Sequence, residues 1–352
     1  MTGITRNGLN IGPGRPMFVI AEAGVNHNGK LDFALGLVDI AADAGADAVK
    51  FQTFRAEHII LRHAPKAQYH IETTGTDNQQ SWFDLLKSQE MSPEMHEACI
   101  ERCNARGIRF LSTPYDEPSV DLLDRLDVPA FKIASTDANN IPFLEYVAAK
   151  GRPIILSTAM CTMEEVEASV AAIRRAGVEE IVVMQCTGSY PAPVPEANLR
   201  AMATIAARCN VATGYSDHTP GAACAVAAVA LGAVAYERHI TLDRRLPGPD
   251  HRASLEPEDF KLLVREIRAT EAALGDGIKR IMPCEADNRV KLQKRVIAAR
   301  PIAAGEVIAR AALATKRTGG VGLMPAHLAA VVGRKAVRPI AVDEPVTEDL
   351  LA

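Results

Sequence analysis

The sequence lacks the long apolar segments that mark membrane and exported proteins. No run approaches the roughly 18 uncharged apolar residues that a membrane helix needs, and the first apolar run, Met17–Ala21, is followed directly by Glu22. No basic-then-apolar segment typical of a signal peptide precedes that run. We therefore expect a soluble cytoplasmic protein without a membrane partner.

The sequence also lacks a large excess of one charge and a set of cysteines spaced for disulfide bonds. Lys and Arg number 39 against 43 Asp and Glu, a formal net charge of -4, so no nucleic-acid partner is expected. The 7 cysteines are odd in number, scattered and without a Cys-x-x-Cys pair, which predicts reduced thiols. With 48% hydrophobic residues, the 352-residue chain can bury a sizeable core, and its length suits one large and one small domain.

Short β-type runs alternate with longer helical runs up to Gly275. The eight expected strands are Met17–Ala23, Ala46–Phe54, Ile108–Pro114, Ala130–Ser135, Pro153–Thr158, Ile181–Thr187, Val211–Ser216 and Val234–Thr241. These runs are continuously apolar, as in parallel strands buried on both faces. The pattern predicts the α/β class and a (β/α)8 TIM barrel over residues 1–277. A doubly wound open sheet is the alternative, disfavoured because no GxGxxG follows the first strand.

The pattern changes from about Arg289 onward. Short apolar pairs such as Val307-Ile308 alternate with turns at Pro301–Gly305 and around Gly319 and Gly320. This predicts a separate small domain over residues 291–352, joined to the barrel by a linker over residues 278–290.

Polar residues stand at the carboxyl end of every expected strand. They are Glu22, Lys50, Gln52, Ser112, Thr113, Lys132, Ser135, Ser157, Thr158, Gln185, Cys186, Thr187, Tyr190, Ser216, Asp217, His218, Glu237, Arg238 and His239. A TIM barrel carries its chemistry at this end, and an unpaired buried charge is costly, so these residues are candidates for a site. The structural alternatives are a salt bridge inside the barrel for Lys50 and Lys132, and a hydrogen bond to backbone for a hydroxyl such as Ser157.

Two features of this set predict ligands. His218 and His239 end adjacent strands, and neutral imidazoles side by side favour a shared divalent metal, although a structural role is the alternative for each. Two lysines and three hydroxyls favour a pocket for a small phosphorylated anion; they are Lys50, Lys132, Thr113, Ser135 and Ser157. A metal beside a phosphate pocket indicates carbon–carbon bond formation or phosphate-ester chemistry, and the residues alone lead no further. In this set we find no second carboxylate beside the two lysines.

A series of motifs resembles the sialic acid synthase family over nearly the whole chain. In order they are Ile20-Ala-Glu-Ala-Gly-Val-Asn-His-Asn-Gly29, Ala48-Val-Lys-Phe-Gln-Thr53, Ser112-Thr-Pro114, Lys132-Ile-Ala-Ser135, Ile155-Leu-Ser-Thr158, Cys186-Thr187 with Tyr190-Pro191, Gly214-Tyr-Ser-Asp-His218, Glu237-Arg-His239, Gly248-Pro-Asp250 and Ala253-Ser-Leu-Glu-Pro257. Each motif is weak alone, but their shared order is strongly specific. The C-terminal part looks like the small antifreeze-like (SAF, β-clip) domain of the same family.

The resemblance implies the roles of individual residues. The catalytic residues would be Glu22, Lys50, Lys132, His218 and His239; the phosphoenolpyruvate contacts would be Lys50, Thr113, Lys132, Ser135, Ser157 and Ser216; the sugar contacts would be Gln52, Asp137, Tyr190, Asp250 and Arg317. The two histidines would hold Mn2+ or Mg2+, with Co2+ a further candidate. The family forms a domain-swapped homodimer, which implies that Arg317 reaches the partner's sugar. Three positions depart from the family pattern: Asp137, where many members have glutamate; Gly188, where some have asparagine; and Thr318, where the pattern has proline.

The resemblance also implies a reaction. Phosphoenolpyruvate, N-acetylmannosamine and water would give N-acetylneuraminate and phosphate by cleavage of a carbon–oxygen bond, with Glu22 stabilising positive charge at the enol carbon or orienting water. The legionaminic acid precursor, 2,4-diacetamido-2,4,6-trideoxymannose, and a 6-phosphorylated sugar are alternative acceptors, the latter giving N-acetylneuraminate 9-phosphate. Three other activities remain open: a Schiff-base aldolase that uses Lys132, an octulosonate-phosphate type of synthase, and a non-catalytic sugar-binding protein.

Overall fold

A ring of parallel strands forms the first part of the computed structural model, which describes residues 3–64, 66 and 81–352. The strands are β1 Phe18–Gly24, β2 Ala48–Thr53, β3 Arg109–Pro114, β4 Phe131–Ile133, β5 Ile154–Ser157, β6 Ile181–Cys186, β7 Ala212–Asp217 and β8 Ala235–His239. They pair in the order β3-β2-β1-β8-β7-β6-β5-β4, and β3 and β4 at its two ends lie against each other. The predicted TIM barrel is therefore confirmed.

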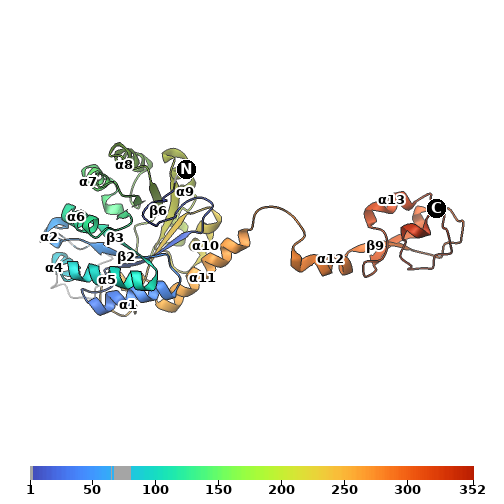
Figure 1. Ribbon diagram of the computed structural model, residues 1–352, viewed down its shortest axis with the longest axis horizontal. Coiled ribbons are helices and arrows are strands. Elements are labelled where there is room, and N and C mark those ends of the chain that lie inside the picture. Colours follow the sequence, from blue (N-terminus) through green and yellow to red (C-terminus); the bar gives the residue numbers. More distant parts are fainter. Residues whose placement is uncertain (1–2, 65, 67–80) are drawn as a thin grey trace. The chain divides into compact units, whose positions relative to one another are not determined.

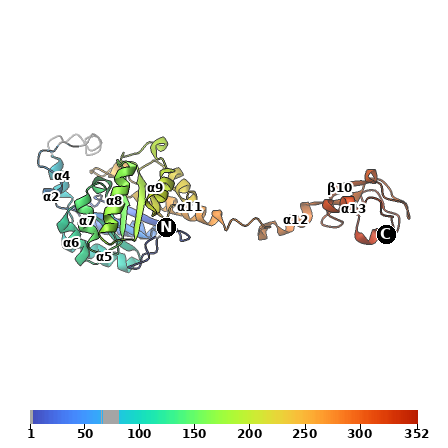
Figure 2. The ribbon, with the colours of Figure 1, turned by 90° about the horizontal axis from the view of Figure 1, so that it is seen from above.

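Helices cover the outside of this ring (Figure 1, Figure 2). They are α1 Leu31–Asp43, α2 Ala56–Ile59, α4 Trp82–Ser88, α5 Pro93–Arg106, α6 Glu117–Arg125, α7 Ile141–Ala148, α8 Met163–Arg175, α9 Ala201–Cys209, α10 Ala223–Ala230 and α11 Pro257–Leu274. Local signals explain where some of them begin. The Ser92 hydroxyl accepts from the Met95 N–H before α5, and Thr162 and Glu165 form a capping box at the start of α8. No helix in the described ranges is both long and apolar enough to cross a membrane.

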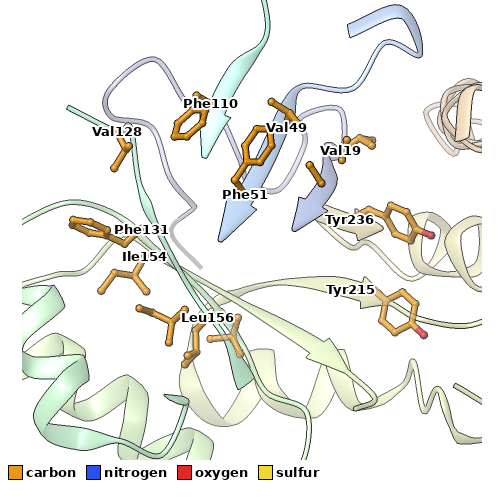
Figure 3. Packing of buried hydrophobic residues seen from close by; sticks show 14 of the residues in the cluster. Val19, Val49, Phe51, Phe110, Val128, Phe131, Ile154, Leu156, Tyr215 and Tyr236 are labelled. Atoms are coloured by element: carbon orange, nitrogen blue, oxygen red, sulfur yellow. The ribbon is translucent and has the colours of Figure 1, made fainter. Parts of the chain in front are cut away.

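Two apolar layers hold the barrel together. The larger layer lies between strands and helices and includes the outward-facing Val19, Val49, Phe110 and Leu156 (Figure 3). The smaller layer contains strand residues such as Ile20 but none from a helix, and it fills the barrel interior. A short N-terminal hairpin joins this inner layer, with Ile4 and Ile11 exchanging backbone hydrogen bonds of 2.7 and 2.8 Å; its members are Ile4, Leu9 and Ile11.

Residues Asp276–Ala352 form a second compact unit with its own apolar core. It contains α12 Ala286–Leu292, β9 Lys294–Ala298, β10 Leu313–Arg317 and α13 Leu328–Val331, and β9 and β10 pair antiparallel. Two of its loops repeat one set of contacts, in which an arginine and a glutamate six residues later form an ion pair of 2.7 Å at Arg300–Glu306 and 2.8 Å at Arg338–Glu344. The glutamates also accept from the backbone N–H groups of Ala303 and Ala341, so each carboxylate closes its own turn.

Candidate active site

Polar side chains replace the inner apolar layer toward the carboxyl ends of the strands. Side chains alternate between the two faces of a strand, so residues two or four positions after a member of the inner layer also point into the barrel. The residues placed in this way are Glu22, Lys50, Thr113, Lys132, Ser157, Cys186, Ser216 and Glu237, and all of them are buried. Each of the eight barrel strands thus contributes one group to a single polar layer.

Two lysines and two carboxylates form the centre of this layer. The Lys50 ammonium lies 3.0 Å from Glu22 Oε2 and 3.5 Å from Glu237 Oε2, and the Lys132 ammonium lies 3.6 Å from Glu237 Oε1. The prediction that no second carboxylate stands beside the lysines is therefore wrong. The sequence held the missing signal, because Glu237 precedes His239 by two positions on one strand and must share its face.

Hydroxyl groups extend this charged centre. Lys50 donates to Thr113 Oγ1 at 2.9 Å, Lys132 donates to Ser157 Oγ at 2.6 Å, and Ser216 donates to Glu237 Oε1 at 3.1 Å. Ser135 differs, because it starts a 3-10 turn just beyond β4, and its Oγ accepts from the Ala159 N–H at 2.8 Å. That turn also ends β4 at Ile133, before the expected Ser135.

Burial and mutual attraction set the protonation of the four charged groups. Burial raises the pKa of Glu22 to about 7, although Lys50 opposes the rise. Burial would also raise the pKa of Glu237, but Lys132 and Lys50 outweigh it and lower that pKa to about 2. Burial lowers the pKa of Lys132, whereas the two carboxylates raise the pKa of Lys50 despite its burial. Glu22 is therefore the carboxyl group that can exchange a proton near neutral pH.

The two predicted metal ligands lie together above this layer. The ring centroids of His218 and His239 are 5.4 Å apart. His218 Nδ1 donates to the Thr187 carbonyl at 2.7 Å, which leaves its Nε2 with a free lone pair. Burial lowers the pKa of His218 to about 4 and that of His239 well below its usual value, so both imidazoles are neutral at pH 7.

This donor set fits a divalent metal with positions left open. Neutral imidazole nitrogen is a common ligand of such ions, and the buried His239 Nδ1 has no hydrogen-bond partner among the residues that the structure describes. Among the described residues, no group of three or more His, Cys, Asp and Glu side chains could enclose an ion. His218 and His239 would therefore supply only part of a coordination shell, and oxygens of substrate or water would complete it.

The residues predicted to contact the sugar divide into two groups. The Tyr190 ring lies against His218, with centroids 4.0 Å apart and the planes tilted by 35°, and it meets His239 edge-on at 5.6 Å. Asp250 Oδ2 lies 3.8 Å from His239 Nδ1, and burial raises the pKa of Asp250 to about 6. Gln52 donates to Glu22 Oε1 at 3.2 Å. These side chains surround the histidines and the charged centre.

Of the other two predicted sugar contacts, Asp137 follows β4 and Arg317 belongs to the second compact unit. Asp137 is half-buried on the turn after β4, where its carboxylate accepts from Asn140 Nδ2 at 3.2 Å. Arg317 ends β10 in the second compact unit and is exposed, so its approach to a sugar stays a prediction. In the loop after it, the Thr318 hydroxyl donates to the Val321 carbonyl, a contact that the proline of the family pattern could not make.

Gly188 leaves space that a neighbouring loop uses. A Cβ at position 188 would lie 3.2 Å from Met160 Cγ, and Met160 adopts a left-handed φ of 63°. Met160 and Cys186 line a cavity of about 400 Å³ beside the polar layer. A larger residue at 188 would therefore push Met160 toward this cavity.

Comparison with known proteins assigns this site to a family. Residues 37–279 match the NeuB family, and residues 295–352 match the SAF domain. The chain belongs to the NeuB family. Members of this family condense phosphoenolpyruvate with sugars, so the predicted synthase activity class and the predicted SAF domain are both confirmed. The Schiff-base aldolase, the octulosonate-phosphate synthase and the non-catalytic sugar-binding protein are thereby set aside.

Several members of the NeuB family are similar to this chain along its length. The N,N'-diacetyllegionaminic acid synthase of Campylobacter jejuni is 41% identical over 332 residues, which cover 94% of this chain and 98% of that protein. The N-acetylneuraminate-9-phosphate synthase of Homo sapiens is 36% identical over 350 residues, or 97% of this chain and 96% of that protein. Among solved structures, the N-acetylneuraminic acid synthetase of Leptospira borgpetersenii in complex with citrate gives a TM-score of 0.70 at 34% identity and covers 82% of this chain and 95% of that one.

Proposed function

We propose that this NeuB-family enzyme makes a nonulosonic acid by joining phosphoenolpyruvate to an N-acetylated amino sugar in a cytoplasmic, reducing environment. The observation that carries the proposal is the buried pair Lys50 and Lys132 around Glu237, together with the neutral pair His218 and His239, since His239 follows Glu237 by two positions on β8. The lysines and their hydroxyl neighbours suit a phosphate and a carboxylate, while the imidazoles suit a metal. Its 7 free cysteines agree with a compartment that keeps thiols reduced.

The charged centre would change its pairing when phosphoenolpyruvate binds. Lys50 and Lys132 are already paired with Glu22 and Glu237, so an incoming anion competes with those carboxylates. Glu22, with a pKa of about 7, can take up a proton and release Lys50 to the anion. Glu237 stays ionised and keeps both ammonium groups in place. Thr113, Ser157 and Ser216 would bind the remaining oxygens.

Carbon–carbon bond formation would then occur above this centre. The methylene carbon of phosphoenolpyruvate attacks the sugar aldehyde, and positive charge develops at the enol carbon. Once Glu22 has passed its proton to a phosphate oxygen, its carboxylate can stabilise that charge or orient the water that adds there. The resulting intermediate loses phosphate, which carries away the bridging oxygen. A divalent metal held by His218 and His239, Mn2+ or Mg2+ or else Co2+, would polarise the aldehyde.

The choice of acceptor rests on the comparisons. The chain is 41% identical to an N,N'-diacetyllegionaminic acid synthase and 36% identical to an N-acetylneuraminate-9-phosphate synthase. We therefore place 2,4-diacetamido-2,4,6-trideoxymannose first and N-acetylmannosamine, the choice from the sequence alone, second. Comparing kcat/KM for these sugars and N-acetylmannosamine 6-phosphate decides between them. A clear preference for the phosphorylated sugar would contradict this order.

A swapped homodimer would complete the site through Arg317. The side chain is exposed on its own unit and sits where the family motif has an arginine, which supports a role at a partner's barrel mouth. Inactive Arg317→Ala and Glu22→Ala chains, refolded together, should regain activity because one site of the mixed dimer is intact. Verified mixed dimers that stay inactive would indicate that Arg317 acts within one chain or not at all.

An isotope experiment tests the reaction itself. Phosphoenolpyruvate labelled with heavy oxygen at the bridge should pass all label to phosphate, because Lys50 and Lys132 favour departure of the phosphate with that oxygen. Label retained in the sugar acid would contradict carbon–oxygen cleavage. Borohydride should trap no lysine adduct, and a chelator should abolish turnover until Mn2+ or Mg2+ is restored; full turnover in excess chelator would contradict the metal assignment.

A further inference from the structure

A buried ion pair lies directly behind the two histidines, on the outer face of the same strands. Asp217 and Arg238 are register partners of β7 and β8, and His218 and His239 are the next residues along the chain. Arg238 Nη1 lies 3.4 Å from Asp217 Oδ1, and the two side chains are 0% and 3% exposed. Because side chains alternate, the ion pair faces outward while the histidines face inward.

Further hydrogen bonds join this ion pair to the backbone on both sides of His218. Asp217 Oδ1 accepts from the Thr219 N–H and hydroxyl, each at 2.7 Å, and Arg238 Nη1 donates to the Thr219 carbonyl and, at 3.5 Å, to the Asp217 carbonyl. Asp217 Oδ2 accepts from the Tyr236 hydroxyl at 2.7 Å. The residue before His218 and the residue after it are therefore tied to the residue before His239.

We propose that Asp217, Arg238, Thr219 and Tyr236 form a clamp that sets the separation of the two imidazoles. The clamp residues are positioning residues, since they lie on the outer side of the strands and would act through the two histidines. The inference rests on the proposed function, because it assumes that His218 and His239 hold a metal together. According to this proposal, residues on the outer face of the strands influence the affinity for the metal, although the metal ligands themselves face the barrel interior.

The geometry favours this role over packing alone. An apolar pair of similar volume at positions 217 and 238 could fill the same space, and buried ion pairs are weak contributors to stability in general. A planar guanidinium that contacts both a carboxylate and a carbonyl has a fixed geometry that an apolar side chain or a lysine cannot reproduce. Figure 3 shows Tyr236 and its neighbour Tyr215 projecting from the same face of β8 and β7. The Tyr236 hydroxyl donates to Asp217 on this face.

Titration of the full-length, metal-free protein with Mn2+ alone tests the clamp, with free Mn2+ followed by electron paramagnetic resonance. We expect Arg238→Lys to raise the Kd for Mn2+ about tenfold or more, as for other residues that support metal ligands. Tyr236→Phe should raise it about threefold, because it removes one hydrogen bond and little volume. Ser112→Ala is the matched control. It removes a buried outward-facing hydroxyl that lies 2.7 Å from Thr53 Oγ1 between β2 and β3, at the same end of the barrel.

The outcomes separate the clamp from general stability and from the proposed function. Wild-type affinity in both clamp variants, or equal weakening in Ser112→Ala, would overturn the clamp. If Arg238→Lys does not fold, the Kd of Tyr236→Phe for Mn2+ tests the clamp, because an unchanged melting temperature of this variant rules out a general loss of stability. Wild-type protein that binds no more Mn2+ than His218→Ala would overturn the metal site and the clamp together. Release of phosphate from phosphoenolpyruvate at saturating Mn2+ then reports separately whether the synthase activity exists.

Discussion

The two ends of the barrel interior are built from different chemistry. At the amino ends of the strands, Ile4, Ile11 and Ile20 lie in an apolar cluster with 0% exposure. At the carboxyl ends, Glu22, Lys50, Lys132 and Glu237 occupy the equivalent inward positions and are just as buried. Apolar burial stabilises the ring at one end, whereas buried charges at the other end do little for stability and are useful for binding anions. The same local pattern thus serves folding at one end and chemistry at the other.

The largest expected effect comes from breaking the charged end. Glu237→Gln removes the carboxylate that lies 3.5 Å from Lys50 and 3.6 Å from Lys132, so the lysines lose their alignment and repel each other. We expect kcat to fall about 10²–10³-fold, the usual cost of removing one preorganised electrostatic group. The rate of phosphate release, with phosphoenolpyruvate and the preferred sugar as substrates, measures this fall in kcat.

Glu180→Gln is the control at the opposite end. Glu180 Oε1 accepts from the Thr5 N–H of the N-terminal hairpin at 2.8 Å, so its loss should affect stability without changing kcat. An equal loss of turnover in the two variants would contradict the division between the ends.

Breaking the apolar end should reduce stability and leave chemistry alone. Ile11→Ala creates a cavity in a fully buried cluster, and such changes cost about 2–5 kcal/mol of unfolding free energy. Urea unfolding of the barrel measures the cost, while kcat at a temperature where the variant is folded should match wild type. Leu231→Ala, at a site 53% exposed, should change neither quantity. A fall in kcat for Ile11→Ala would show that the two ends are coupled.

A glycine between the two ends should affect both. A Cβ on Gly214 of β7 would lie 2.6 Å from the Ala235 carbonyl of β8, so Gly214→Ala forces the two strands apart and should cost about 1–3 kcal/mol. Because β7 leads to His218 and β8 ends in His239, Mn2+ affinity should weaken as well. Thermal unfolding and Mn2+ titration of this one variant measure both effects. Weaker stability with unchanged affinity would show that the strand separation does not reach the histidines.

The smallest effect is expected from the exposed ion pairs of the second unit. Arg300 and Arg338 repeat one contact with Glu306 and Glu344, but the arginines are about half exposed and solvent screens the attraction. Arg300→Ala and Arg338→Ala should therefore each leave the melting temperature close to wild type and resemble each other. A fall in melting temperature as large as that of Gly214→Ala, in either variant, would mean that these ion pairs hold their turns in place.

Much of the barrel followed from local patterns, but its charged centre did not. The eight apolar runs became the eight strands because a strand buried on both faces needs apolar residues throughout. The polar residues at their carboxyl ends were also found, since they interrupt those runs. Glu237 was among those polar residues, but its place beside the lysines was missed, although its spacing from His239 put it on the inward face. Its two lysine partners could not be paired with it from sequence, because they lie on β2 and β4.

The sequence by itself determined which side chains face inward, because alternation along a strand is set by the backbone and needs no partner. It also determined the two histidines as neighbours, since β7 and β8 follow each other in the chain. The tertiary structure decided which charges meet. Lys132 on β4 and Glu237 on β8 are far apart in the strand order and come within 3.6 Å only because the ring closes and brings opposite strands together across its interior. The register of the neighbouring strands β7 and β8 decided that Asp217 and Arg238 pair behind the histidines, because a buried carboxylate and a buried guanidinium each need a partner of opposite charge.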